Sequence, residues 1–235
     1  SKIIIKQWSI MKIFDCFMYF DEEIVLDTRL NYLDRFVDYF VIVESKFTHR
    51  GDSRNLNFDI NKFSKFKDKI IYNVIDKQPS DIEEIYEYDA DKKDTRGQKL
   101  VNNSNKREHF QRNGALESLK NIDQEDVILI NDIDEIPNLD EINLRNINKK
   151  IIIFKQKVFL YKFNLLYEGL SWYGSKACKK KYFISPQWLR DVKHKKYSHI
   201  FLISRLDQVL RSDSPCPTPR RASPIRPPSP VSACS

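Results

Sequence analysis

Most of this chain alternates between short, strongly apolar runs and longer segments in which apolar residues recur every three or four positions. The short runs contain almost no polar positions, which is typical of strands covered on both faces of a sheet. On this basis the sequence predicts strands at residues 12–19, 39–43, 69–74, 127–130, 151–154 and 158–166.

The segments between these runs predict helices. Leucines recur at helical spacing within residues 21–36, where Asp21 is placed to cap the helix. Further helices are predicted at residues 58–66, 105–119 and 139–147, and from residue 185 onward. Helices that alternate with strands predict the α/β class, here as a three-layer α/β/α sandwich with a mostly parallel central sheet.

Three acids follow the predicted strand at residues 127–130: Asp132, Asp134 and Glu135, with Pro137 just beyond. Proline cannot continue a central strand, so the acids lie where the chain leaves the sheet, the edge at which α/β proteins bind ligands. Asp132 and Asp134 could share one Mn²⁺ or Mg²⁺, with substrate phosphate oxygens completing its shell. Glu135 points the other way and would orient a ligand or brace the loop. The alternative interpretation is a solvated acidic turn.

Two further positions belong to the predicted ligand edge. Arg112, which is followed by Asn113 on the helix before the acidic strand, could pair with a phosphate bidentately, or it could be a solvated helix residue. Glu44, at the end of the second strand, could accept hydrogen bonds from a base or ribose, or it could form a salt bridge with Arg29. Both alternatives remain open for each residue.

Composition narrows the class of ligand. The chain has 235 residues and a net charge of +7, of which five arginines and two aspartates beyond residue 204 contribute +3, leaving +4 elsewhere. A mildly basic protein suits an anionic ligand, but the basic and aromatic residues are not interleaved as in nucleic-acid-binding modules. The five glycines form no phosphate-binding loop. A bound metal would therefore carry much of any phosphate binding.

The sequence also predicts where the domain begins and ends. Residues 1–11 are expected to be an N-terminal extension and residues 12–204 one C-terminally truncated domain. Residues 205–235 form a disordered tail rich in proline, serine and arginine, and their change of composition indicates non-native sequence; a proline-rich partner-binding tail is the alternative. No apolar run is long enough for a membrane span or a signal peptide, which predicts a cytoplasmic protein without a transmembrane segment.

Several segments, in order, resemble glycosyltransferase family 17, the family of the β-1,4-mannosyl-glycoprotein N-acetylglucosaminyltransferase. The resemblance covers about residues 12–190, and the block Asp-Ile-Asp-Glu-Ile-Pro at 132–137 is one of its specific parts. The other segments that carry it are residues 14–23, 29–30, 37–45, 48–49 and 111–113. Trp172, Ser175-Lys176, Ser185-Pro186 and Leu189-Arg190 also match the texture of the family.

This resemblance implies a GT-A-like fold and an inverting transfer of a sugar, GlcNAc, from a UDP-sugar donor to a glycan hydroxyl. It implies that Asp132 and Asp134 bind the metal and the diphosphate, and it places Glu44, Arg112 and Asn113 in the donor site. The general base that inversion requires is not identified, and we expect it in the missing C-terminal part. Two alternatives remain: a haloacid-dehalogenase-like phosphatase that uses Asp132 and Asp134, and a catalytically dead nucleotide-sugar-binding module.

Overall fold

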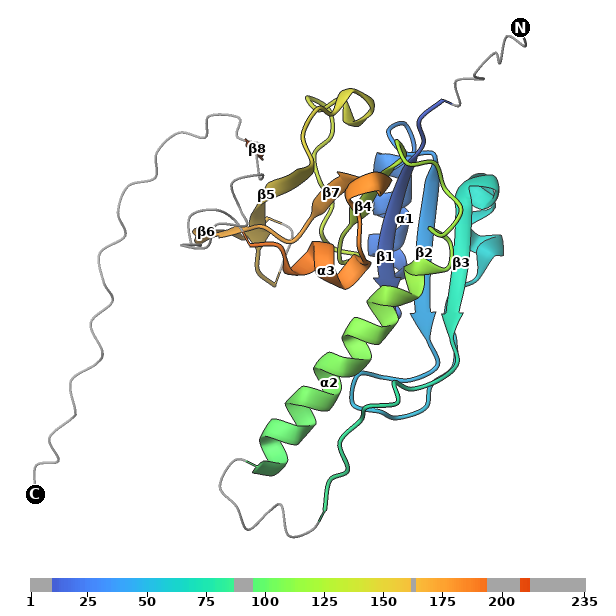
Figure 1. The fold of residues 1–235 in the computed structure, drawn as a ribbon, viewed down its shortest axis with the longest axis vertical. Coiled ribbons are helices and arrows are strands. Elements are labelled where there is room, and N and C mark those ends of the chain that lie inside the picture. The colour runs from blue at the N-terminus through green and yellow to red at the C-terminus, as the bar shows by residue number, and fades with distance from the viewer. Residues whose placement is uncertain (1–9, 87–94, 162–163, 194–207, 212–235) are drawn as a thin grey trace, which may run out of the picture.

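The structure is a computed structural model that describes residues 10–86, 95–161, 164–193 and 208–211. Its strands are β1 (Ile13–Tyr19), β2 (Tyr39–Ser45), β3 (Ile70–Ile75), β4 (Val127–Ile130), β5 (Ile151–Phe159), β6 (Leu166–Trp172), β7 (Lys176–Lys179) and β8 (Gln208–Arg211) (Figure 1). Its α-helices are α1 (Glu23–Leu33), α2 (Thr95–Asn113) and α3 (Pro186–Asp191). Short 3₁₀ segments are η1 (Ile60–Lys69), η3 (Gly114–Leu116), η4 (Leu144–Asn146) and η5 (Lys180–Tyr182).

The strands form a mixed sheet in the order β3-β2-β1-β4-β7-β5-β6, with β8 paired to β5 off this path. The first four strands in that order are parallel, whereas β7 pairs antiparallel with both β4 and β5, and β5 antiparallel with β6. The α/β class is therefore confirmed. The predicted parallel arrangement holds for β3, β2, β1 and β4. It does not hold for β7, β5 and β6, each of which runs antiparallel to the strand before it in this order.

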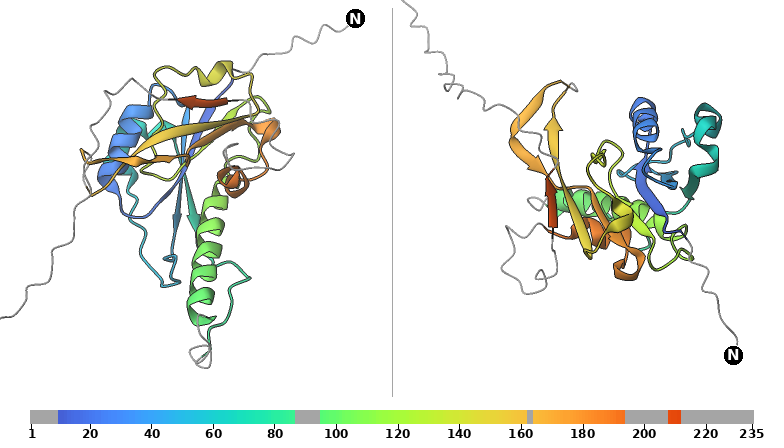
Figure 2. Two further views of the ribbon diagram at one scale, coloured as in Figure 1. Left: turned by 90° about the vertical axis from the view of Figure 1, so that its left-hand side faces the viewer. Right: turned by 90° about the horizontal axis from the view of Figure 1, so that it is seen from above.

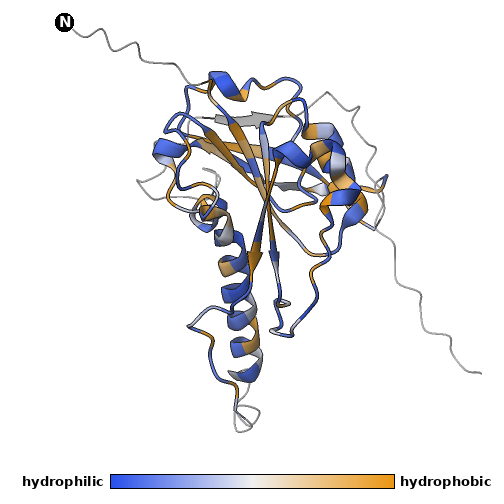
Figure 3. Ribbon diagram, turned by 90° about the vertical axis from the view of Figure 1, so that its right-hand side faces the viewer, coloured by the Kyte–Doolittle hydropathy of each residue, from blue (hydrophilic) through white to orange (hydrophobic). Residues whose placement is uncertain are grey.

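Apolar residues cluster on both faces of the parallel half. One cluster joins alternate residues of β1, β2 and β4 to the leucines of α1 and the phenylalanines of η1. The other joins apolar residues on the opposite face of these strands to η3 and α3. Figure 2 shows α1 and η1 on one side of these strands and α3 on the other. This double cover explains the unbroken apolar runs in the sequence. Helix α2 extends well beyond the sheet and is largely hydrophilic along its length (Figure 3).

The strands end at different levels, and this positions the acidic loop. The pairing of β1 with β4 stops at Cys16 and Ile130, while β1 continues beside β2 as far as Tyr19 opposite Glu44. The chain after β4 therefore turns away beside strands that have not yet ended. The carboxyl edge of the sheet is therefore uneven, and Asp132 lies just beyond the end of the shorter strand, β4.

Several predicted elements changed in extent. Helix α1 begins at Glu23 and receives no side-chain cap, so the expected capping by Asp21 is wrong. The predicted helix at 105–119 begins earlier and ends in η3, and the one at 139–147 is reduced to η4. The strands predicted at 151–154 and 158–166 are replaced by the single strand β5, and β6 and β7 were not predicted.

The predicted extension and tail fall largely outside the described residues. Residues 1–9, 194–207 and 212–235 are not described, so the end of the predicted domain and most of the predicted tail cannot be compared with the structure. Within the predicted tail, β8 pairs in parallel with β5. Within the described ranges, no helix is long and apolar enough to cross a lipid bilayer.

Candidate active site

The backbone of the acidic loop is held by one buried arginine. Arg29 of α1 donates from Nε and Nη2 to the two carboxylate oxygens of Asp15, at 2.8 and 2.6 Å, and both side chains are fully buried. Its Nη1 donates to the carbonyl oxygens of Asp132 (3.3 Å), Ile133 (3.1 Å) and Glu135 (2.9 Å). A single guanidinium thus fixes the loop's conformation through its main chain.

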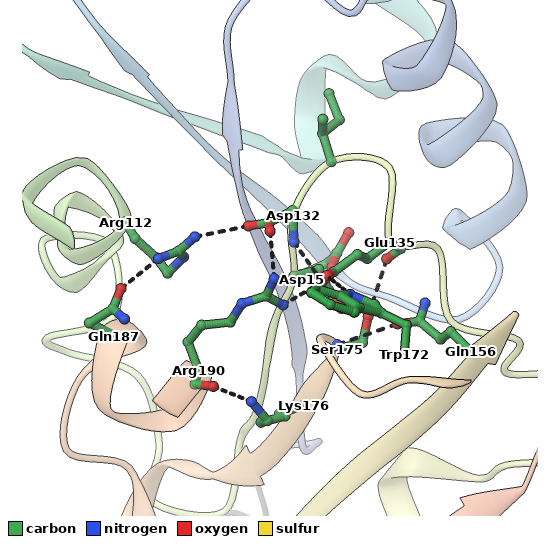
Figure 4. Close-up of polar contacts among 12 residues, drawn as sticks. Asp15, Arg112, Asp132, Glu135, Gln156, Trp172, Ser175, Lys176, Gln187 and Arg190 are labelled. Atoms are coloured by element: carbon green, nitrogen blue, oxygen red, sulfur yellow. Dashed lines mark hydrogen bonds and ion pairs between the residues drawn. The ribbon is translucent and has the colours of Figure 1, made fainter. Parts of the chain in front are cut away.

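The first acid of the loop lies between two other arginines. Asp132 Oδ1 accepts a hydrogen bond from Arg112 Nη2 at 3.0 Å, and Oδ2 accepts one from Arg190 Nη2 at 2.5 Å (Figure 4). Arg112 comes from α2 and Arg190 from α3, so the site joins both helices to the end of β4. The Asp132 side chain keeps 32% of its surface exposed, which leaves it accessible to a ligand.

Glu135 braces the loop, one of the two roles predicted for it. Its carboxylate accepts hydrogen bonds from both Nη atoms of Arg190, from the backbone N–H of Asp132 at 3.0 Å and from the indole N–H of Trp172. A side chain at Gly174 would overlap this carboxylate. The third acid is therefore committed to protein contacts.

Asp134 is the exposed member of the three acids. Partial burial of its carboxyl group and the neighbouring charges of Glu135 and Asp132 raise its pKa above the ordinary value for aspartate. A cation bound beside Asp134 would relieve this crowding of negative charge. Carboxylate oxygens are the ligands that hard divalent cations prefer, so Asp134 and Asp132 are the residues of this site that could hold one.

A cavity of about 780 Å³ opens beside these acids. Asp132 and Asp134 line one side, and residues 18–20 at the end of β1 and 47–50 after β2 line the others. The start of α1 and Gln111 of α2 complete its wall. Its position matches the rule that ligands bind outside the carboxyl ends of parallel strands.

Glu44 forms a salt bridge, as one of the two alternatives predicted, but with a different arginine. It is fully buried, and its carboxylate accepts from Arg54 Nη2 (2.9 Å), Tyr72 Oη (2.7 Å) and the backbone N–H groups of Asn57 and Phe58. The predicted salt bridge to Arg29 is wrong, because Glu44 pairs with Arg54. Glu44 does not line the cavity; it ties the loop after β2 to β3.

Arg112 and Asn113 connect α2 to α3. Asn113 Oδ1 accepts from the backbone N–H of Gln187 at 3.0 Å, and it does not line the cavity. Arg112 is 4% exposed, so the solvated alternative is wrong. Its Nη atoms donate to Gln187, Glu108 and Asp132, whereas Nε has no partner in the described part of the chain. Like Asn113, Arg112 does not itself line the cavity.

Sequence reasoning did not assign Arg190 or Lys176 to the site. Arg190 lies in the last turn of a short helix that Ser185 caps, and nothing in its local sequence marks it as a partner of Asp132. Lys176 of β7 donates from Nζ to the backbone carbonyl of Arg190. Burial and the nearby Arg190 guanidinium lower the pKa of Lys176 to about 8. Lys176 thus holds the end of α3 that presents Arg190.

Together, the fold and this edge define an α/β protein with a charged site at the carboxyl ends of parallel strands. The family model of glycosyltransferase family 17 matches residues 5–204. The chain therefore belongs to glycosyltransferase family 17, a family of transferases. No curated protein matches the chain, and no solved structure does.

Proposed function

We propose that this protein is a metal-dependent, inverting glycosyltransferase with a GT-A-like fold. It moves a sugar, GlcNAc in our proposal, from a UDP-sugar to a glycan hydroxyl. Family membership supports the reaction class. The observation that carries the site is that Asp132 and Asp134 line one cavity together with the loops after β1 and β2.

In this proposal Asp134 and Asp132 hold Mn²⁺ or Mg²⁺. Among the described residues no group of three or more His, Cys, Asp or Glu side chains is arranged to hold a metal. The remaining ligands would therefore be diphosphate oxygens and water, as is usual for cations that act on phosphates. When bound, the cation supplies positive charge that stabilises the departing diphosphate.

Arg112 and Arg190 supply the other positive charges of the diphosphate site. Both guanidiniums already meet at Asp132, which lines the cavity. Guanidinium groups pair with phosphates through two parallel hydrogen bonds, which also fixes orientation. These arginines replace the glycine-rich loop that the sequence lacks.

The nucleoside occupies the cavity and the acceptor lies on the other side of the acidic loop. The cavity volume of about 780 Å³ is within the range typical of small-molecule sites. Trp172 is 43% exposed and donates its indole N–H to Glu135, so its ring lies beside the charged cluster. Such an amphipathic ring suits a sugar face, and we place the acceptor glycan there.

The phosphatase alternative is not supported by the family match, which is to a family of transferases. The catalytically dead alternative differs from our proposal in activity, so it is distinguished by experiment: binding of UDP without transfer or hydrolysis would favour it.

A thermal-shift panel of nucleotide sugars, with and without Mn²⁺, tests the proposal. We expect UDP and UDP-GlcNAc to raise the melting temperature in the presence of Mn²⁺ and to have little effect after chelation, because ligands stabilise the state they bind. The same melting temperature across the whole panel would contradict the proposed donor site.

A further inference from the structure

Gln111 of α2 has a fixed amide orientation. It is 6% exposed, and its Nε2 donates to the backbone carbonyls of Val43 at 3.0 Å and Tyr19 at 3.4 Å. The opposite orientation would place the amide oxygen against both carbonyls, so the hydrogen-bond pattern permits one assignment. Gln111 therefore presents Oε1, which only accepts hydrogen bonds, toward the cavity side of β1 and β2.

This orientation sets the tautomer of His49. Gln111 Oε1 lies 3.1 Å from His49 Nε2, so His49 must carry its hydrogen on Nε2 and donate it to Gln111. In a neutral ring Nδ1 then bears a lone pair. No described residue donates a hydrogen bond to Nδ1, and His49 lines the cavity shared with Asp132 and Asp134.

The loop that carries His49 is held in place before any ligand binds. The N–H of Thr48 donates to the carbonyl of Asp52 at 2.8 Å, and the N–H of Gly51 donates to the carbonyl of Thr48 at 2.9 Å. Gly51 has a φ of 107°, which favours glycine, and Arg107 Nη1 donates to the carbonyl of His49. The acceptor on His49 is therefore preorganised by both its ring and its backbone.

We propose that His49 Nδ1 accepts a hydrogen bond from the nucleoside of the donor and selects the nucleotide, with Gln111 as its positioning residue. This inference rests on the proposed donor site. The ligand must offer an N–H or O–H at that point. Uracil offers a ring N–H where cytosine has a lone pair, and the ribose offers hydroxyls.

Calorimetric dissociation constants, measured with Mn²⁺ present, test the inference and distinguish the two sources. UDP, CDP, 2′-deoxy-UDP and 3′-deoxy-UDP are titrated into wild-type protein, His49→Phe and the matched control His109→Phe, since His109 is an exposed residue that does not line the cavity. We expect wild type to prefer UDP over one analogue by roughly 10-fold, which is the worth of one hydrogen bond. His49→Phe should lose that preference, and His109→Phe should keep it.

The preference ratio within each variant is compared, because a ratio is insensitive to small structural changes that weaken all ligands together. His49→Ala serves as a second variant if the phenylalanine does not fold. Loss of the UDP-to-CDP ratio identifies the ring N–H, and loss of a UDP-to-deoxy ratio identifies a ribose hydroxyl. Unchanged ratios in a variant that still binds UDP overturn the role of His49 alone. Absence of UDP binding in wild type overturns the donor site as well.

Discussion

Removal of the Arg29 side chain tests the link between the acidic loop and the core. The change Arg29→Met deletes the cation that pairs with Asp15 and donates to three carbonyls of the loop, and it keeps apolar volume against Phe17, over whose ring the guanidinium lies at 4.7 Å. Asp15 would then be left as a buried charge. Asp15 would still accept a hydrogen bond from the side-chain amide of Asn131, at 2.6 Å.

The expected loss of unfolding free energy is large. Removing one partner of a buried ion pair costs about 3–5 kcal/mol, because the other charge remains buried without compensation. The whole folded state is typically stable by roughly 5–15 kcal/mol, so Arg29→Met should lose a large part of it. The unfolding free energy of Arg29→Lys should lie between those of wild type and Arg29→Met, since lysine keeps the charge and lacks the planar guanidinium that reaches the carbonyls. Adding Asp15→Asn to Arg29→Met should recover part of the loss.

Urea denaturation followed by tryptophan fluorescence measures these differences. The matched control is Arg35→Met, which breaks an exposed ion pair with Asp140 in which the Arg35 side chain is 62% exposed. Such a pair is worth about 0–1 kcal/mol, so the control should stay near wild type. A loss below about 1 kcal/mol for Arg29→Met would refute the assigned role of Arg29.

Three other changes probe the charged cluster. Gly174→Ala forces a methyl group into the carboxylate of Glu135 and should destabilise the fold by about 1–3 kcal/mol in a denaturation experiment. Arg190→Met removes a cation from Asp132 and Glu135, so calorimetry should show Mn²⁺ alone binding more tightly and UDP binding roughly 10-fold more weakly. Lys176 has a pKa lowered from 10.5 to about 8 in the folded state, so the unfolded chain binds more protons between these values. The stability of wild type relative to Lys176→Met should therefore rise with pH in that window, by at most about 1.4 kcal/mol per pH unit.

For each of these three changes, one result would contradict the predicted effect. For Gly174→Ala the control is Gly97→Ala, whose added methyl group meets nothing within 4 Å and which should gain about 0.5–1 kcal/mol in helix α2. Equal stability of the two variants would contradict the crowding at Glu135. Stronger UDP binding by Arg190→Met would contradict the proposal that Arg190 binds the diphosphate. A stability difference for Lys176→Met that is flat or falls from pH 8 to 10.5 would contradict the lowered pKa.

The parallel half of the fold was predictable because its physical cause is local. Strands β1, β2 and β4 are covered on both faces, and burial on both faces leaves unbroken apolar runs in the sequence. Strand β7 left no such signal. It contributes Ala177 and Cys178 to the two cores, but lysines stand at both ends of its four residues, so composition alone indicates a basic loop.

The position of the two acids was predictable, and their partners were not. Asp132 and Asp134 line the cavity at the edge of the sheet, which is where a strand end next to a proline placed them. The partner of Asp132 lies 58 positions away at Arg190, and only the packing of α3 beside β4 brings the two together. The partner of Glu44 was not predictable for the same reason. Glu44 pairs with Arg54 instead of Arg29 because of the path of the loop after β2.

Binding of UDP to wild type and Asp134→Asn, measured by calorimetry with and without Mn²⁺, tests the proposed metal-dependent donor site most directly. Asp140→Asn is the matched control, because Asp140 is an exposed acid on the same segment that lies outside the cavity. We predict UDP binding that requires Mn²⁺ in wild type and in Asp140→Asn and that is lost in Asp134→Asn. Equal binding by all three proteins, or binding that ignores Mn²⁺, would contradict the account.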